Sequence, residues 1–208
     1  MTRPRKLQRR VKADAARREL LVFVEGKVTE EEYLNFYRRR HRRIVNVEIP
    51  DFRGGPLQLV EHAIDAKRRN ERDAKRGRGR AHDEVWCVFD VDEHPDLNRA
   101  MSLARDHGIK LAISSPCLEL WFLLHFEDQT AYLDRAQAQS SAKRHLRSGK
   151  SLSRTALEAL DERYEIARDR AQKLDTKHRG DDSRPHTSPS SGIWRLVDSI
   201  SEAPPRKR

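Results

Sequence analysis

The sequence predicts an α/β fold: a mostly parallel sheet flanked by helices, with a C-terminal helical extension. Along the first 127 residues, short apolar runs of strand length alternate with longer segments of helix length, as in repeated strand–helix–strand units. The clearest run, Val85 to Asp90, is apolar at nearly every position, which is typical of a strand covered on both faces. After residue 127 the chain becomes helical and charged.

The first strand is expected at Leu20 to Val24, a short apolar run that ends in Glu25 and Gly26. Gly26 permits the tight exit that such a strand needs. Thr29 and Glu32 have the spacing of a capping box, so Thr29 is predicted to be the N-cap of the following helix. Because the amides of that helix would be occupied by its own cap, a phosphate-cradling loop is not expected there.

A second strand, Ile44 to Ile49, and a helix from Leu57 to about Arg76 follow. The second half of this helix lacks an apolar stripe, so it must project into solvent or lie on a partner. It continues into a glycine-rich loop that we expect to be flexible. Eight bases face two acids between residues 67 and 80. This basic arm is either a solvated helix tip or a clamp on nucleic-acid phosphates. Its candidate contacts are Arg68, Arg69, Arg72, Lys75, Arg76, Arg78 and Arg80.

After the acidic strand end, a helix over residues 95–107 and a strand at Ile109 to Ile113 are predicted. The next helix, Cys117 to Phe126, is apolar almost all round and must be buried. Glu119 within it needs a partner, because an unpaired buried carboxylate is costly. It is either a third wall of an acidic site or the partner of a buried arginine. His125 is interpreted as a core histidine.

The remaining segments are expected to be helices over residues 136–147 and 155–177, then a loop over 181–192. So long a connector is either functional or disordered. A last amphipathic helix, Ile193 to Ile200, is expected to dock on the sheet. Its docking residues would be Trp194, Val197 and Ile200.

Length and charge suggest one core with basic ends. The 208 residues carry a formal net charge of +10. The first 18 residues and the last three together account for this charge, so the rest of the chain has no net charge. We expect a disordered basic arm at 1–18, a core at 19–127, a helical extension over 128–203 that packs back on the core, and a basic tail at 204–208. Such a distribution suits a polyanion held near an acidic, cation-binding site, although basic ends can also serve solubility alone.

The same composition argues against a membrane protein or a secreted one. No apolar run approaches 18 residues, and the basic N-terminus lacks an apolar segment of the signal-peptide type. The two cysteines, Cys87 and Cys117, lie in apolar surroundings and are too few for a zinc cluster. They are expected to be core thiols in a reducing cytosol, so a cytoplasmic location is predicted.

Asp90 and Asp92 are the candidate metal ligands. Residues two apart in an extended segment project to the same side, and these two stand at the carboxyl end of a strand, where open α/β sheets bind ligands. Their carboxylates repel each other unless a cation lies between them. A hard divalent cation, Mg²⁺ or Mn²⁺, suits such oxygen ligands. The alternative is a solvated acidic strand end.

The order strand–Glu-Gly, helix, strand, helix, strand–Asp-x-Asp resembles the Toprim domain of topoisomerases, primases and OLD-family nucleases. More specific motifs are similar to those of the RloB-like family of prokaryotic defence proteins, and they span about residues 20 to 200. These are Val24-Glu-Gly-Lys-Val-Thr-Glu-Glu-Glu-Tyr33, Phe89-Asp-Val-Asp92, Ser114-Ser-Pro-Cys-Leu-Glu-Leu-Trp-Phe-Leu-Leu-His125 and Pro189-Ser-Ser-Gly-Ile-Trp-Arg-Leu-Val197.

The resemblance implies a Toprim-like, Rossmann-like core and a Mg²⁺-dependent phosphodiester nuclease of antiphage defence, working with a partner ATPase. By position, Glu25 matches the Toprim glutamate, with a catalytic role, and Asp90 and Asp92 match the metal-binding aspartates. Glu119 matches the glutamate of the family's Pro-Cys-x-Glu-Leu-Trp motif. The substrate is RNA, with tRNA as one candidate, or DNA. Whether the protein forms a homodimer is left open by the resemblance.

Three other functions are consistent with parts of the pattern. A non-catalytic adaptor that binds nucleic acid or an ATPase would keep the fold, although it has no need of Glu25, Asp90 and Asp92 together. A haloacid-dehalogenase phosphatase would carry its Asp-x-Asp motif on the first strand, not on a later one. A primase-like nucleotidyl transferase would require a further nucleotide-binding domain, for which 208 residues leave no room.

Overall fold

The computed structural model describes residues 17–91, 95–147, 151–184 and 186–202. Five strands form one sheet in the order β2-β1-β3-β4-β5. The strands are β1 Arg18–Val24, β2 Val45–Glu48, β3 Glu84–Asp90, β4 Lys110–Ser115 and β5 Ser190–Ser191. The helices are α1 Thr29–Arg40, α2 Pro56–Lys75, α3 Leu97–Asp106, α4 Leu118–Leu124, α5 Arg135–Leu146, α6 Arg154–Glu162, α7 Tyr164–Gly180 and α8 Ile193–Ser201.

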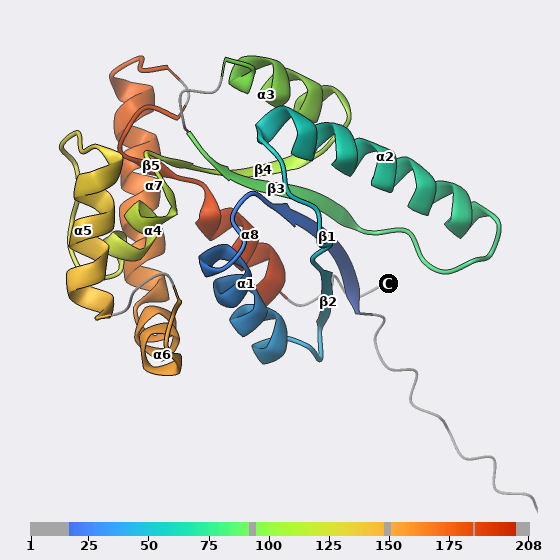
Figure 1. Cartoon of the computed structure of the whole chain (residues 1–208), viewed down its shortest axis with the longest axis horizontal. Helices are drawn as coiled ribbons and strands as arrows, with labels where there is room; N and C mark the ends of the chain where they lie inside the picture. Colours follow the sequence, from blue (N-terminus) through green and yellow to red (C-terminus); the bar gives the residue numbers. More distant parts are fainter. Residues whose placement is uncertain (1–16, 92–94, 148–150, 185, 203–208) are drawn as a thin grey trace, which may run out of the picture.

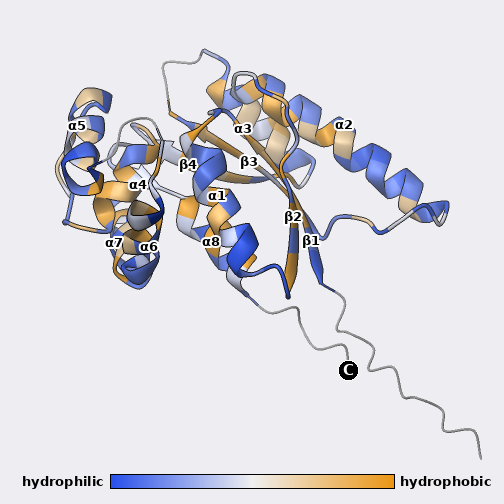
Figure 2. Ribbon diagram, turned by 60° about the horizontal axis from the view of Figure 1, so that its bottom comes forward, coloured by the Kyte–Doolittle hydropathy of each residue, from blue (hydrophilic) through white to orange (hydrophobic). Residues whose placement is uncertain are grey.

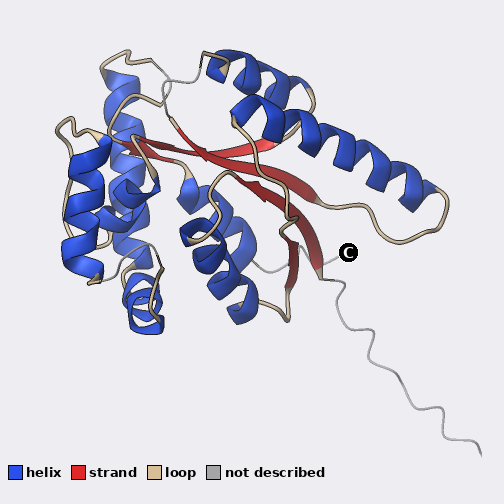
Figure 3. Ribbon diagram, in the orientation of Figure 1, coloured by secondary structure: helices blue, strands red, loops and turns tan. Residues whose placement is uncertain are grey.

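The four longer strands are parallel and β5 is antiparallel to β4. Helices cover both faces of the sheet: α2 and α3 lie on one side, and α1 and α8 on the other, with the C-terminal helices beyond (Figures 1 and 3). The predicted α/β class, with its mostly parallel Rossmann-like sheet and C-terminal helical extension, is confirmed.

The alternation of side chains along β1 explains why both faces need a helical cover. Leu20, Val22 and Val24 belong to the larger apolar cluster, with α1, α4 and α8. Leu21 and Phe23 belong to the second cluster, with α2 and α3. All five side chains are buried, so the continuous apolar run predicted a doubly covered strand correctly.

The crossover helix α2 sets the direction of the basic arm. It begins just after β2 and runs back antiparallel to the strands, so that its C-terminal end lies at the amino end of β3 (Figure 1). That half of the helix is hydrophilic along its length (Figure 2). At 20 residues, α2 is about 30 Å long.

The end of the loop after α2 is anchored by hydrogen bonds that lie beyond its two glycines, and the flexibility expected at those glycines stays a prediction. Asn70 Nδ2 donates to Arg80 O at 3.1 Å, and His82 N donates to Asn70 Oδ1 at 2.7 Å. The Arg80 guanidinium also donates to Arg17 O at 2.9 Å. These bonds fix the path of the chain into β3.

The predicted capping box at the start of α1 is wrong. Thr29 is the first helical residue, and Val28 holds the N-cap position without a side-chain cap. Glu32 instead accepts hydrogen bonds from Ser151 Oγ at 2.7 Å and Leu152 N at 2.6 Å. The carboxylate is therefore used to join α1 to the start of the α6 segment, a contact between distant residues that the local spacing does not encode.

The helix predicted over 155–177 is two helices, broken at Arg163. The break places the Tyr164 hydroxyl against α8, where it donates to Asp198 Oδ1 at 2.6 Å and Trp194 O at 3.0 Å. In α8 itself, Leu196, Val197 and Ile200 are buried, whereas Trp194 is only partly buried. Two of the three expected docking residues are thus correct.

The segment 181–192 contains an element that the sequence did not predict. Ser190 and Ser191 pair with Ser115 and Ser114 as the short antiparallel strand β5. The Oγ atoms of Ser114 and Ser191 lie 2.9 Å apart in a buried hydrogen bond. Because serine has low strand propensity, only the pairing with β4 makes this a strand.

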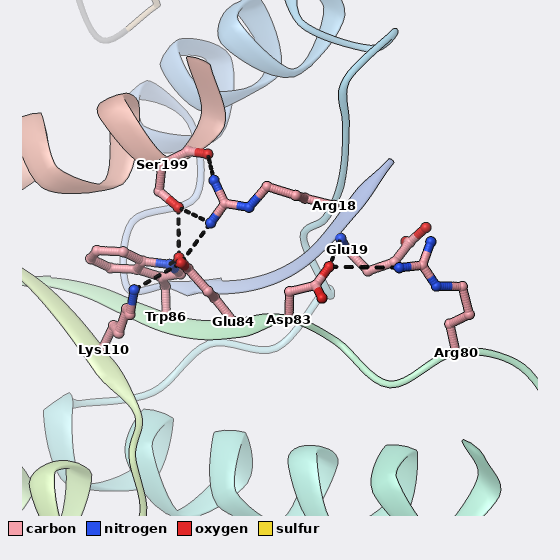
Figure 4. A network of polar contacts seen from close by, with 8 residues as sticks. All are labelled: Arg18, Glu19, Arg80, Asp83, Glu84, Trp86, Lys110 and Ser199. Carbon is pink, nitrogen blue, oxygen red and sulfur yellow. Dashed lines mark hydrogen bonds and ion pairs between the residues drawn. The ribbon is translucent and has the colours of Figure 1, made fainter. Parts of the chain in front are cut away.

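A polar network closes the amino edge of the sheet (Figure 4). Glu84 at the start of β3 accepts from Arg18 of β1 at 2.6 Å and from Trp86 Nε1 at 2.7 Å. Ser199 of α8 donates to the same carboxylate at 2.6 Å, and Lys110 of β4 pairs with it at 2.8 Å. One carboxylate therefore ties three strands to the last helix.

Among the helices of the described residues, none has the length and apolar character that crossing a lipid bilayer requires. The N-terminal arm as far as residue 16 and the tail 204–208 lie outside the described residues. The C-terminal helices pack back on the sheet region, since α7 contacts α4, and α8 contacts β4 and α1.

Candidate functional site

The candidate site begins with two carboxylates brought together by neighbouring strands. β1 and β3 are parallel and adjacent, so Glu25 and Asp90, which lie at their carboxyl ends, come to the same edge. Asp90 N donates to Glu25 Oε2 at 3.3 Å, and Glu25 N donates to Val88 O at 3.0 Å. The predicted convergence of these two residues is therefore present.

A third carboxylate, Glu30, reaches this edge from the first turn of α1. It packs over Gly26, where an added Cβ atom would collide with the Glu30 carboxylate. The absence of a Cβ atom at Gly26 therefore leaves room for this carboxylate above the strand end. Glu30 is not among the site residues predicted from the sequence.

Glu119 approaches from α4 on the same side. The hydrogen bond from Trp121 Nε1 to Tyr33 Oη, 2.7 Å long and buried, holds α4 against α1. Glu119 and Glu30 line one cavity of about 450 Å³, together with Lys27 and Lys143. Within the described part of the chain, Glu119 has no arginine partner. Of the two expected roles for Glu119, the structure favours a wall of the acidic site.

The carboxylates strongly influence one another. Burial raises the pKa of Asp90 to about 8, and the charges of Glu30, Glu119 and Glu25 add to this effect, while Arg135 opposes it. Burial, Glu119 and Glu25 likewise raise the pKa of Glu30. The cluster is therefore short of positive charge.

The cation that pairs with Asp90 is Arg135, the first residue of α5. Its guanidinium lies 3.0 Å from Asp90 Oδ2, and the Asp90 side chain is only 16% exposed. Arg135 is 45 residues away in sequence, and its place is fixed by the packing of α5 on α4. Nothing in the local sequence predicts this contact, whereas the position of Glu30 is suggested by its place in the first helical turn after the strand end.

The metal-binding prediction is not tested by this geometry and stays a prediction. Among the described residues, no three His, Cys, Asp or Glu side chains are placed to hold one metal ion together. Asp92, one of the two predicted ligands, lies outside the described residues. The oxygen donors that are described nevertheless suit Mg²⁺, which keeps several waters and needs only one or two protein carboxylates.

The basic arm is not brought to the acidic cluster. Arg68, Arg69, Arg72 and Lys75 line a shallow pocket on α2 together with two acids, and the arm ends at the amino edge of the sheet (Figure 1). Arg78 lies 3.9 Å from Asp73. Asp90 lies at the opposite edge, so a role of the arm in nucleic-acid binding stays a prediction.

Three buried side chains, one histidine and two cysteines, lie in the core, as expected. His125 is 1% exposed, and its Nδ1 lies 2.8 Å from Trp121 O, so it is a core histidine. Both cysteines are free and buried. Burial raises the pKa of Cys87 and of Cys117 above the usual value for a thiol, to which Glu119 adds in the case of Cys117.

The fold and the site together define an α/β protein with a Rossmann-like sheet and an acidic cluster at the carboxyl ends of its central strands. The model of one protein family, described as RloB-like protein, matches residues 20–200. The chain therefore belongs to the RloB-like family. No curated protein and no solved structure shows significant similarity to it.

Proposed function

We propose that this chain is a Toprim-type, metal-dependent nuclease that cleaves phosphodiester bonds in RNA or DNA as an effector of antiphage defence. The observation that carries the proposal is the meeting of Glu25 and Asp90 at one strand end, with Glu30 and Glu119 beside them. Nothing in the packing of the sheet requires several carboxylates at this edge, and grouping them raises the electrostatic cost of folding.

In this proposal Asp90 and Asp92 hold Mg²⁺ or Mn²⁺, directly or through water, and Glu119 completes the acidic wall. When bound, such an ion neutralises charge on the phosphoryl oxygens and activates a water molecule. Glu25 lies within hydrogen-bonding distance of the Asp90 backbone, which positions its carboxylate to accept or return a proton at the same edge. In this proposal Arg135, which pairs with Asp90 at 3.0 Å, yields the Asp90 carboxylate to the ion.

The test is cleavage of pooled tRNA, other RNA and DNA with Mg²⁺ or Mn²⁺ by wild type, Asp90→Asn and Glu25→Gln. We expect each variant to lose about 100-fold or more of the activity. Glu61→Gln is the matched control, because it removes an exposed carboxylate on α2 and should retain full activity. Circular dichroism would establish that all three variants are folded. Cleavage by Asp90→Asn at the wild-type rate would reject the nuclease.

A second function, a non-catalytic adaptor that binds nucleic acid or an ATPase, is favoured by one observation. Arg135 pairs with Asp90 at 3.0 Å, and a guanidinium that neutralises a buried carboxylate is also what a purely structural site would contain. The same assays separate the two functions when they are repeated with the partner ATPase that we propose for the nuclease. An adaptor would bind this ATPase without cleaving any nucleic acid in either condition.

A further inference from the structure

A second polar cavity lies close to the acidic cluster, in the segment whose role the sequence left open. It has a volume of about 300 Å³ and lies between the C-terminal end of α7, the following loop and the start of α8. Its lining includes three arginines, two histidines and a buried serine: Arg179, Arg184, Arg195, His178, His186 and Ser190.

The strand pairing fixes the position of this cavity relative to the acidic site. Asp90 pairs with Ser114 across β3 and β4, and Ser114 pairs with Ser191 across β4 and β5. Ser191 lines the cavity, so the cavity wall is two strands from Asp90, roughly 10 Å at the usual strand spacing. Both sites open at the carboxyl edge of β3 and β4, unlike the basic arm of α2.

The cavity carries a positive charge that is not compensated by its own lining. Among the described residues that line it, Asp175 is the one carboxylate, and Arg195 pairs with it at 2.5 Å while stacking on Trp194. Within the described residues, Arg179 and Arg184 have no carboxylate at ion-pair distance. Burial and the charge of Arg195 lower the pKa of His186. The two unpaired guanidinium groups are therefore the source of the charge.

Hydrogen-bond donors converge on the same space. The Ser190 side chain is buried, and its hydroxyl has no hydrogen-bond partner among the described residues. Gly192, which also lines the cavity, is the N-cap of the nine-residue helix α8, whose positive end therefore adjoins it. His178 is held in place by a 2.9 Å contact of its Nε2 with Pro189 O. Guanidinium forks, a free hydroxyl and a helix N-terminus are the groups that bind phosphate in proteins.

We propose that this cavity is a phosphate-binding subsite for the nucleic-acid strand whose neighbouring phosphodiester lies at the acidic cluster. Arg179 and Arg184 would hold the phosphate, and Arg195, fixed by Asp175 and Trp194, would complete the cavity wall. The inference rests on the proposed nuclease function for the nature of the ligand. In this inference the 181–192 segment holds a phosphate that lies about one or two nucleotides from the phosphodiester to be cleaved, since single strands carry one phosphate per nucleotide.

The experiment measures binding without cleavage. Fluorescence anisotropy in EDTA would follow short single-stranded RNA and DNA of one sequence on wild type and on Arg179→Gln/Arg184→Gln. We expect the double variant to raise the Kd about tenfold and to lower the slope of log Kd against log salt by ~1.4, as expected for two lost phosphate contacts. The RNA and DNA arms show whether the subsite distinguishes the two sugars.

Arg68→Gln/Arg72→Gln is the matched control, because it removes the same charge from positions of α2 that are exposed, as Arg179 and Arg184 are. It should change the Kd less than threefold. An equal loss in both double variants, a loss in the α2 variant alone, or no binding by wild type would overturn the subsite. Binding in EDTA does not depend on a metal, so it is measured separately from cleavage. A protein that binds through the subsite in EDTA but does not cleave with Mg²⁺ or Mn²⁺ would refute the nuclease and not the subsite.

Discussion

At the scale of single residues, Asp90 is expected to lower the stability of the fold when it is ionised, although the proposed function needs its carboxylate. Its carboxylate is mostly buried, and three other carboxylates surround it, so its pKa is raised to about 8. In the unfolded chain an aspartate ionises near pH 4. The folded protein therefore binds one proton more than the unfolded chain between these two pH values, and stability falls as pH rises through this window.

Replacing Asp90 by Asn should remove this pH dependence. Without metal, we expect Asp90→Asn to be more stable than wild type at pH 8, by on the order of a few kcal/mol. The difference should disappear below about pH 3, where the wild-type carboxyl is protonated in both states. Urea denaturation in EDTA at several pH values measures it. A variant less stable than wild type at pH 8 would show that the Arg135 pair outweighs burial.

At the scale of elements, the two ends of the central strands carry carboxylates in different surroundings. The carboxyl ends of β1 and β3 carry carboxylates that repel one another, whereas the amino end of β3 carries a carboxylate with many partners (Figure 4). Burial alone would raise the pKa of Glu84. Hydrogen bonds from Lys110, Ser199 and Trp86 outweigh it and lower that pKa below the usual range. This edge stabilises the fold and the opposite edge is available for chemistry.

Glu84→Gln tests the stabilising edge. The change leaves Arg18, whose side chain is 12% exposed, without its charged partner, and we expect a loss of about 3–5 kcal/mol. Because the folded-state pKa of Glu84 is lowered, the wild-type advantage should be present at neutral pH and should fall as pH decreases through that pKa. Chemical denaturation of wild type, Glu84→Gln and the exposed control Glu61→Gln measures this. Equal stability of the three proteins at pH 7 would contradict the network.

At the scale of the whole molecule, the sequence predicted the sheet better than the surface. The apolar runs of β1 and β3 and the helical lengths between them fix a parallel sheet, since each run must be covered on both faces. That order alone places Glu25 and Asp90 at one edge. By contrast, β5 is a strand only because it pairs with β4, and neither propensity nor periodicity encodes that pairing.

The site residues that sequence reasoning missed come from tertiary packing. Arg135 reaches Asp90 because α5 packs on α4, and the subsite of Arg179 and Arg184 exists because the end of α7 meets the start of α8. The basic arm was the clearest cluster of charge in the sequence, yet the antiparallel course of α2 places its end at the opposite edge (Figure 1). The direction of a crossover helix is a property of the topology, so a charge run on such a helix can be located once the strand order is known.

The most direct test of the central claim is Mn²⁺ binding, followed by the electron paramagnetic resonance of free Mn²⁺. We expect wild type to bind Mn²⁺ and added Mg²⁺ to displace it. We expect Asp90→Asn to lose this binding and Glu61→Gln to keep it. Uptake by Asp90→Asn equal to that of wild type, or no uptake by any of the three proteins, would contradict a divalent cation at the edge where Glu25 and Asp90 meet.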